Sequence, residues 1–212
     1  MEFIVAVDGP AGSGKGTITK LVGEKENLVY IDTGALYRCV TLAMLRKNIG
    51  LEDLEQIQEI LNTIDIEFKQ VNGEKKVYLN NENVSKEIRE AAVNKFVSQV
   101  SHIVIVREAI TDLSRKIANG KQVIMEGRDI GTNVFPNADV KIYLDATPEE
   151  RARRRQKQNE EKGINIPFEE IIENIKFRDN NDKTSKVAPL KQADDAIYID
   201  SSNMTIEEVA EK

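Results

Sequence analysis

The sequence predicts an α/β fold: a five-stranded parallel sheet flanked by helices, with a small antiparallel β insert and a helical lid. Short apolar runs alternate with stretches of helical spacing, which is typical of parallel strands joined by crossover helices. A glycine-rich loop joins the first apolar run to the first helix. Only the segment 64–94 combines two-residue alternation with an Asn-Gly turn, which indicates a hairpin.

The first apolar run, residues 3–7, is followed by Asp8 and a glycine-rich loop. Its glycines allow the backbone to wrap an anion, and the amides at the start of the next helix favour negative charge. Lys15 adds a full positive charge. The loop therefore predicts a cradle for the phosphates of a nucleoside triphosphate; a glycine-rich turn of another α/β protein is the alternative. Its residues are Gly9, Pro10, Ala11, Gly12, Ser13, Gly14, Lys15, Gly16 and Thr17.

The end of this loop departs from the usual phosphate-loop pattern. The common form has serine or threonine directly after the lysine, where its hydroxyl binds magnesium. Here Gly16 follows Lys15, and the hydroxyl comes one place later, at Thr17. We therefore expect no direct protein ligand for the metal.

The remaining elements follow in chain order. A helical stripe (Ile18, Leu21, Val22) precedes a strand at 28–31, a loop at 32–34, a helix ending near 48–50, a helix at 52–62 and the hairpin at 64–79. A long helix at 96–118, strands at 122–125 and 140–144, a helix from Pro148 capped by Thr147 and broken by Gly163, a helix at 167–177, a strand at 196–199 and a helix from 206 complete the chain. The last helix stops abruptly at Lys212, which suggests a missing final turn.

Polar residues stand at the ends of the predicted strands: Asp8, Asp32, Glu126 and Asp145. In open parallel sheets ligands bind at the carboxyl ends of the strands. We therefore expect these residues to converge on one edge. The domain division we predict is a core of 1–63 and 95–212, with a lid at about 148–164, interrupted by the insert 64–94, which is too small to hold much core of its own.

Composition restricts the functional classes. The chain has 212 residues, of which 40% are hydrophobic and 31% charged, and a formal net charge of −6, which argues against a nucleic-acid partner. No apolar run approaches the roughly 20 residues that cross a bilayer. The single cysteine, Cys39, and the single histidine, His102, exclude an internal disulfide, a cysteine zinc cluster and a histidine triad. We expect a cytoplasmic monomer that contacts neither membrane nor nucleic acid.

Arginines outside the phosphate loop suggest a second phosphorylated ligand. Arg38 and Arg128 follow strand ends, Arg107 lies on the long helix, and Arg178 with Asp182 comes late in the chain. A guanidinium fork binds phosphate oxygens bidentately, although each arginine alone could be an ordinary surface residue.

Three further arginines lie on the helix from Pro148. Arg151, Arg154 and Arg155 share one face at spacings of three and four. A lid that closes over the phosphates and excludes water would have this form, whereas a solvated helix face is the alternative.

Two phosphorylated ligands imply a particular chemistry. The acceptor phosphate has a second pKa of about 6, so its oxygen is ionised at neutral pH and no general base is needed. Catalysis would then consist of in-line positioning and neutralisation of charge by Lys15, arginines and Mg2+.

Longer segments carry a specific resemblance. They are Asp8-Gly9-Pro10, 32–38 (Asp-Thr-Gly-Ala-Leu-Tyr-Arg), Ser98-Gln99-Val100 with Arg107, 126–132 (Glu-Gly-Arg-Asp-Ile-Gly-Thr), Phe135-Pro136, 141–146, Arg178-Asp179 and 187–190 (Val-Ala-Pro-Leu). In this order and spacing they resemble the bacterial cytidylate kinases, a family of P-loop nucleoside monophosphate kinases, over nearly the whole chain. The family has its monophosphate-binding insert where this chain has 64–94.

The resemblance implies transfer of the γ-phosphate of ATP to CMP or dCMP. It implies that the loop 9–17, Arg151 and Arg155 bind ATP, that Lys15, Arg128 and Arg154 are catalytic, and that Mg2+ is held through phosphates and water, with Glu126 orienting that water. The implied acceptor contacts are Ser98, Arg107 and Asp129 to cytosine, Arg178 and Asp182 to ribose, Arg38 and Arg128 to the monophosphate, and Thr33 in the same pocket.

The chain departs from the family at one position. Three residues after the aspartate that matches Asp182, the family usually has an arginine that touches both phosphate groups, and this chain has Ser185. Lys183 or Lys186 could act there only as a point charge, so we expect a weaker clamp or a shifted loop.

Two other readings stay open. One is a kinase for AMP, UMP or a non-nucleotide acceptor. The other is a nucleotide-dependent switch or binding module, although the sequence contains neither an Asp-x-x-Gly nor an Asn-Lys-x-Asp signature.

Overall fold

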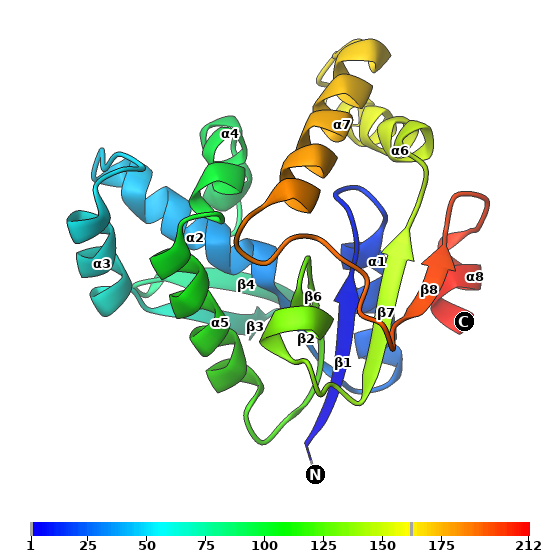
Figure 1. The fold of residues 1–212 in the computed structure, drawn as a ribbon, viewed down its shortest axis with the longest axis horizontal. Helices are drawn as coiled ribbons and strands as arrows, with labels where there is room; N and C mark the ends of the chain where they lie inside the picture. The colour runs from blue at the N-terminus through cyan, green and yellow to red at the C-terminus, as the bar shows by residue number, and fades with distance from the viewer. Residues whose placement is uncertain (1, 162) are drawn as a thin grey trace. The chain divides into compact units, whose positions relative to one another are not determined.

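The structure is a computed structural model that describes residues 2–161 and 163–212 (Figure 1). Residue 162, which falls in the predicted lid, lies outside the described residues. The chain divides into two compact units. The first comprises the chain up to Asp32 together with Ala118–Lys212, and the second is Thr33–Ile117.

The first unit holds the predicted parallel sheet, which the structure confirms. Every pair of neighbouring strands is parallel, and the order is β2-β6-β1-β7-β8. Apolar side chains such as Val7, Ile124 and Leu144 form a buried cluster on this sheet, because runs without alternation are buried on both faces. The strands are β1 (Phe3–Asp8), β2 (Val29–Asp32), β6 (Gln122–Gly127), β7 (Val140–Asp145) and β8 (Ile197–Asp200).

The helices of the first unit begin where the sequence places their caps. The Thr147 side chain accepts a hydrogen bond from the Glu150 amide, and Pro148 occupies the first turn, as predicted. The last helix starts with a capping box between Thr205 and Glu208. The elements are α1 (Lys15–Lys25), a π-helical turn η2 (Ile130–Val134), α6 (Pro148–Glu160), α7 (Phe168–Thr184), which packs on α6, and α8 (Ile206–Glu211), which packs on α1.

The second unit combines helices with a three-stranded antiparallel sheet of order β3-β4-β5. The predicted hairpin is confirmed, with Val71 paired to Glu74 across the Asn72-Gly73 turn. Its elements are α2 (Thr33–Arg46), α3 (Leu54–Thr63), β3 (Ile66–Val71), β4 (Glu74–Leu79), β5 (Glu82–Asn83), a 3-10 turn η1 (Glu87–Arg89), α4 (Ala91–Val100) and α5 (Val104–Ala118).

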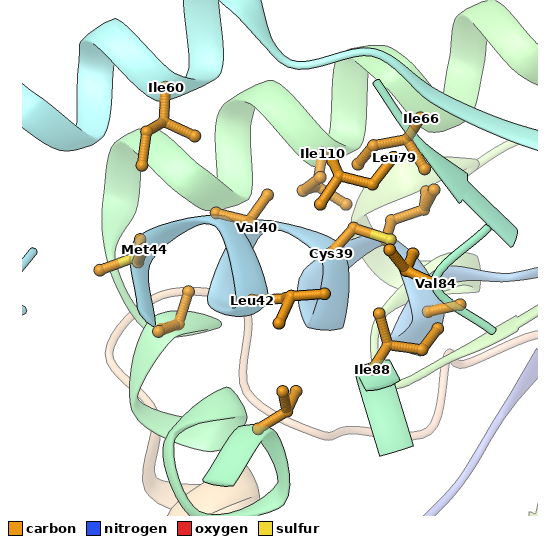
Figure 2. Close-up of a cluster of buried hydrophobic side chains, with 14 of the residues drawn as sticks. Cys39, Val40, Leu42, Met44, Ile60, Ile66, Leu79, Val84, Ile88 and Ile110 are labelled. Carbon is orange, nitrogen blue, oxygen red and sulfur yellow. The ribbon is translucent and has the colours of Figure 1, made fainter. Parts of the chain in front are cut away.

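The core of the second unit surrounds α2 (Figure 2). Cys39, Val40 and Met44 of this helix are buried against Ile60 of α3, Leu79 of β4 and Ile110 of α5. Cys39 is therefore the buried, unreactive filler that the sequence indicates. This core also explains why the unit is wider than the segment 64–94: helices on both sides of the hairpin supply much of the apolar surface.

Several boundaries differ from the sequence-based prediction: the helix predicted over 167–177 continues to Thr184 in α7, and α4 begins at Ala91 rather than at 96. No loop follows Asp32, because α2 begins directly at Thr33. The single helix predicted over 96–118 is two helices, α4 and α5, separated at Ser101–Ile103. The break is stabilised by polar contacts, since Ser101 Oγ donates to the Ser98 carbonyl and Arg107 Nε donates to the Ser101 carbonyl.

No helix within residues 2–161 and 163–212 is long and apolar enough to cross a bilayer.

Candidate active site

The glycine-rich loop runs from the end of β1 into the start of α1. Gly9, Gly12 and Gly14 have φ angles of 149°, 82° and 92°, in the region that favours glycine. A Cβ on Gly9 would lie 2.0 Å from the Leu144 carbonyl oxygen, so no other residue fits there. Gly14 caps α1 without a side-chain hydrogen bond, which leaves the first amides of the helix available to an anion.

Lys15 is buried inside this loop, with 5% of its surface exposed. Its ammonium donates to the Pro10 carbonyl oxygen at 2.8 Å and lies 3.5 Å from Ser13 Oγ. Burial, and after it the charge of Arg128, lower the pKa of Lys15 to about 7. Lys15 is therefore only partly protonated near neutral pH, and a bound anion would stabilise its protonated form.

We expect the protein to take up a proton at Lys15 when ATP binds at pH 8. A pKa of about 7 leaves the amine of Lys15 mostly neutral at that pH, and triphosphate charge shifts it back to the ammonium, so the uptake approaches about 0.9 proton. Titration calorimetry at pH 8 in two buffers of different ionisation enthalpy measures it. Lys15→Ala serves as the control, and equal heats in both buffers for the wild-type protein contradict the expectation.

Carboxylates gather at the ends of neighbouring strands, as the sequence predicts. Asp8 is buried and accepts hydrogen bonds from the amides of Ile130 and Gly131 at 2.8 and 2.7 Å. Burial raises the pKa of Asp8 to about 6 against the opposing effect of these amides. Asp8 thereby links the start of the phosphate loop to the turn η2, which directly follows Arg128 and Asp129.

Glu126, the next-to-last residue of β6, lies beside Asp32 of β2, its partner in the strand register. Burial and then the negative charge of Asp32 raise the pKa of Glu126, while Lys15, a hydrogen bond from Tyr30 and Arg128 oppose the rise. A Cβ on Gly16 would lie 3.0 Å from Glu126 Oε1. The carboxylate therefore lies next to position 16, where the usual phosphate loop has its serine or threonine.

The segment after β6 brings together two of the predicted acceptor residues. Arg128 Nε donates to Asp182 Oδ2 of α7 at 2.8 Å, in a partly buried ion pair. Asp129 is 4% exposed, and its Oδ2 accepts a hydrogen bond from the side-chain Nδ2 of Asn133 at 3.0 Å. Arg178 lies four residues before Asp182, one turn earlier on α7. These four residues share one unit, and their ligand contacts stay predictions.

Arg151 occupies the interior of the first unit. It is 2% exposed and pairs with Asp179 of α7, Nη1 donating at 2.9 Å and Nη2 at 2.5 Å. Its Nη1 also donates to the Ala11 carbonyl of the phosphate loop, and Nε donates to the Ala146 carbonyl. The guanidinium thus donates hydrogen bonds to Ala146, Ala11 and Asp179, and its predicted contact with ATP stays a prediction. Sequence analysis did not assign a role to Asp179.

Arg154 reaches the phosphate loop. Its Nη1 donates to the Ser13 carbonyl at 3.2 Å, Nη2 to the Ser201 carbonyl at 2.6 Å, and Nε to Glu150. Ser201, also absent from the sequence-based prediction, donates to the Ser13 carbonyl as well. Arg155 is exposed. The three arginines of the predicted lid thus have different environments, because the first faces α7 and the third faces solvent.

The second unit carries the other predicted acceptor residues. Arg38 Nη1 donates to Asn94 Oδ1 at 2.7 Å and to the Ile88 carbonyl at 3.0 Å. Arg107 is buried, and its guanidinium lies 5.4 Å from the centre of the Tyr37 ring. Ser98 is half-buried at the end of α4, where its carbonyl accepts from Ser101, and Thr33 is buried at the start of α2.

The binding of magnesium through phosphates and water stays a prediction. Within the described ranges, no group of three or more His, Cys, Asp or Glu side chains could hold a metal. Asp32 and Glu126 nevertheless place two carboxylates at adjacent strand ends, and carboxylate oxygens bind the water shell of Mg2+ well.

A solved structure shares the fold. A crystal structure of an uncharacterized protein from Eubacterium ventriosum superposes with a TM-score of 0.53 at 10% sequence identity, covering 99% of this chain and 94% of that one.

Relatives of much higher identity are named as cytidylate kinases. A cytidylate kinase from Fusobacterium nucleatum is 52% identical over 98% of this chain and 94% of its own length. One from Caldicellulosiruptor bescii is 48% identical over 98% of this chain and 92% of its own. The family model for cytidylate kinase matches residues 5–212. The chain therefore belongs to the cytidylate kinase family.

Proposed function

We propose that this protein transfers the γ-phosphate of ATP to CMP or dCMP, giving CDP or dCDP. The observation that carries the proposal is the buried Lys15 in a loop that leads into a helix whose first amides have no side-chain cap. Such a loop binds a triphosphate. Family membership supports the choice of CMP as acceptor.

The chemistry needs charge and positioning rather than a base. The acceptor phosphate carries its nucleophilic oxygen already ionised at neutral pH, because its second pKa is about 6. Lys15, Arg128 and Arg154 are the cations that we assign to the transferring group. Arg154 is held at the loop by its hydrogen bond to the Ser13 carbonyl, so its side chain loses little conformational entropy when it contacts the phosphates.

The magnesium ion that accompanies ATP supplies charge neutralisation when bound. We assign Glu126 and Asp32 to the orientation of its water shell, because both carboxylates lie at the carboxyl edge of the sheet. Thr17, the displaced hydroxyl of the loop, is exposed on α1.

Recognition of cytosine is assigned to Asp129, with Ser98 and Arg107. A carboxylate accepts a hydrogen bond from the exocyclic amine of cytosine and repels the oxygen that uracil has there. The hydrogen bond from Asn133 fixes the Asp129 carboxylate. We assign Arg178 and Asp182 to the ribose, Arg38 and Arg128 to the monophosphate, and Thr33 to the same pocket.

We expect Asp129→Ala to raise the KM for CMP by about 10- to 100-fold, because a lost bidentate base contact costs about 1–3 kcal/mol. The ratio of kcat/KM for CMP over UMP should fall by a similar factor, while the Kd for ATP stays within about twofold. Asp139→Ala is a carboxylate control: Asp139 is exposed, accepts a hydrogen bond from the Ile4 amide and has no assigned contact with a ligand. An equal loss of ATP affinity in Asp129→Ala contradicts the assignment.

The experiment that tests the function is a coupled assay of ADP release with CMP, dCMP, UMP and AMP at equal concentrations. We expect CMP and dCMP to be the preferred acceptors. A preference for AMP or UMP overturns the acceptor, and binding of ATP without transfer to any of the four favours the switch or binding module.

Ser185, which replaces the expected arginine, has a local role. Its hydroxyl donates to the Val187 carbonyl at 2.8 Å and accepts from the Val187 amide, closing the turn that ends α7. We propose that this protein works without a guanidinium at that position. Both Lys183 and Lys186 are exposed nearby.

A further inference from the structure

The carboxylate of Glu126 is constrained by Tyr30, to which no role has yet been given, and by Gly16 of the phosphate loop. Tyr30 of β2 donates a hydrogen bond from its hydroxyl to Glu126 Oε1. Gly16, the second residue of α1, faces the same carboxylate: a Cβ there would lie 3.0 Å from Oε1 and 3.6 Å from Oε2. A side chain at position 16 would therefore be in tight contact with the Glu126 carboxylate, which would have to shift slightly.

Tyr30 itself is fixed by the fold. It is half-buried, pairs with Ile124 of β6 in the sheet register, and packs on the apolar cluster of the first unit. Its Cβ would lie 3.4 Å from a Cβ on Gly23 of α1. Strand and helix thus hold the phenol, and the hydroxyl at its end has a defined position.

The side chain of Glu126, by contrast, is flexible. A glutamate has three rotatable side-chain bonds, and burial and the charges of Asp32, Lys15 and Arg128 also act on its carboxylate. A tyrosine hydroxyl bonded to a carboxylate is a charge-assisted hydrogen bond with a strong directional preference. Removing the hydroxyl takes one directional restraint away from the carboxylate.

We propose that Tyr30 is a positioning residue, whose hydroxyl holds Glu126 in the space left by Gly16, so that the carboxylate faces the water shell of the Mg2+ bound to ATP. The proposal rests on the proposed function and adds a reason for the unusual glycine after Lys15. A side chain at position 16 would be in tight contact with a carboxylate that Tyr30 holds, and glycine at this position avoids that contact.

The first test is Tyr30→Phe, which removes one oxygen and keeps the packing. Because loss of an outer-shell partner typically lowers metal affinity or activity by about 10- to 100-fold, we expect kcat to fall at least about 10-fold with the KM for CMP within twofold. The second readout does not use turnover: the gain in ATP affinity caused by Mg2+, measured as the ratio of Kd in EDTA to Kd in Mg2+, should shrink several-fold. The Kd in EDTA should stay within twofold.

The second test is a double-mutant cycle with Gly16→Ala. Alanine is favoured over glycine in a helix, so helix propensity does not explain a loss from this change, and the cycle isolates the part that depends on Tyr30. We expect Gly16→Ala to lower the Mg2+-dependent gain in ATP affinity about 10-fold in the wild-type background and less than threefold in Tyr30→Phe, where the carboxylate can yield. Gly50→Ala is the matched control, since a Cβ at Gly50 meets no atom within 4 Å. Tyr198→Phe removes an exposed hydroxyl that lies 3.5 Å from Asp145 and controls for loss of a phenol oxygen.

Equal costs of Gly16→Ala in both backgrounds overturn the proposal, as does a Tyr30→Phe protein whose Mg2+-dependent gain stays within twofold of wild type. A lower thermal midpoint in Tyr30→Phe with unchanged Mg2+ dependence assigns Tyr30 a purely structural role and also overturns it. The ATP-binding measurements remain valid if the wild-type protein transfers nothing to CMP, so failure of the proposed function is distinguishable from failure of this inference.

Discussion

Replacing Lys15 by alanine is expected to lower kcat for phosphoryl transfer by at least about 100- to 1000-fold, because a lost contact to developing charge in a buried site costs about 2.7–4 kcal/mol. Lys15 is the cation inside the loop, and its ammonium is already aligned by the Pro10 carbonyl. The coupled assay with saturating CMP measures kcat, and equilibrium titration measures ATP affinity separately, so that a transition-state effect is distinguished from weaker binding.

Lys20→Ala is the matched control for this change. Lys20 lies on the same helix, but it is exposed and forms only a loose ion pair with Glu24 at 3.8 Å. Its removal should alter kcat by less than twofold, since exposed pairs of this kind contribute about 0–1 kcal/mol. A Lys15→Ala protein with more than a tenth of wild-type kcat contradicts the role of Lys15.

Asp179→Ala is expected to lower the free energy of unfolding by about 3–5 kcal/mol, because it leaves the buried Arg151 guanidinium without its carboxylate. Arg151 is 2% exposed, so water cannot take the place of Asp179 without a rearrangement of α6 and α7. Urea denaturation followed by circular dichroism measures the loss. ATP affinity should fall as well, because Arg151 also holds the Ala11 carbonyl of the phosphate loop.

The control for Asp179→Ala is Glu149→Ala. Glu149 forms an exposed ion pair with Lys176 at 4.0 Å, also between α6 and α7. It should cost less than about 1 kcal/mol. If Asp179→Ala costs no more than Glu149→Ala, the buried pair does not stabilise the fold.

The sequence predicts the sheet and the phosphate loop well because their signals are local. Uninterrupted apolar runs give the strands, and Asn72-Gly73 gives the hairpin, each within a few residues. The boundaries at Thr33 and Ser101 were misplaced for a common reason. Helical spacing of apolar residues continues beyond each of them, and the side-chain contacts that decide where a helix begins or ends, such as Arg107 to the Ser101 carbonyl, are tertiary.

Partners of the candidate site residues were beyond prediction for the same reason. Asp179 is 28 residues from Arg151, and Tyr30 is 96 residues from Glu126. No spacing rule connects such positions. An arginine on an otherwise polar helix predicts a solvated or ligand-binding side chain, so the burial of Arg151 could emerge only from the packing of α6 on α7. Chemistry at strand ends was predictable, whereas the hydrogen bonds that orient it were not.

The close approach of Gly9 to the Leu144 carbonyl means that the phosphate loop packs on β7 through main-chain atoms. The dimensions of this contact follow from the spacing of two adjacent parallel strands, a quantity that hardly varies between proteins. Substitutions along β7 should therefore leave the shape of the phosphate loop unchanged, provided that Gly9 is retained.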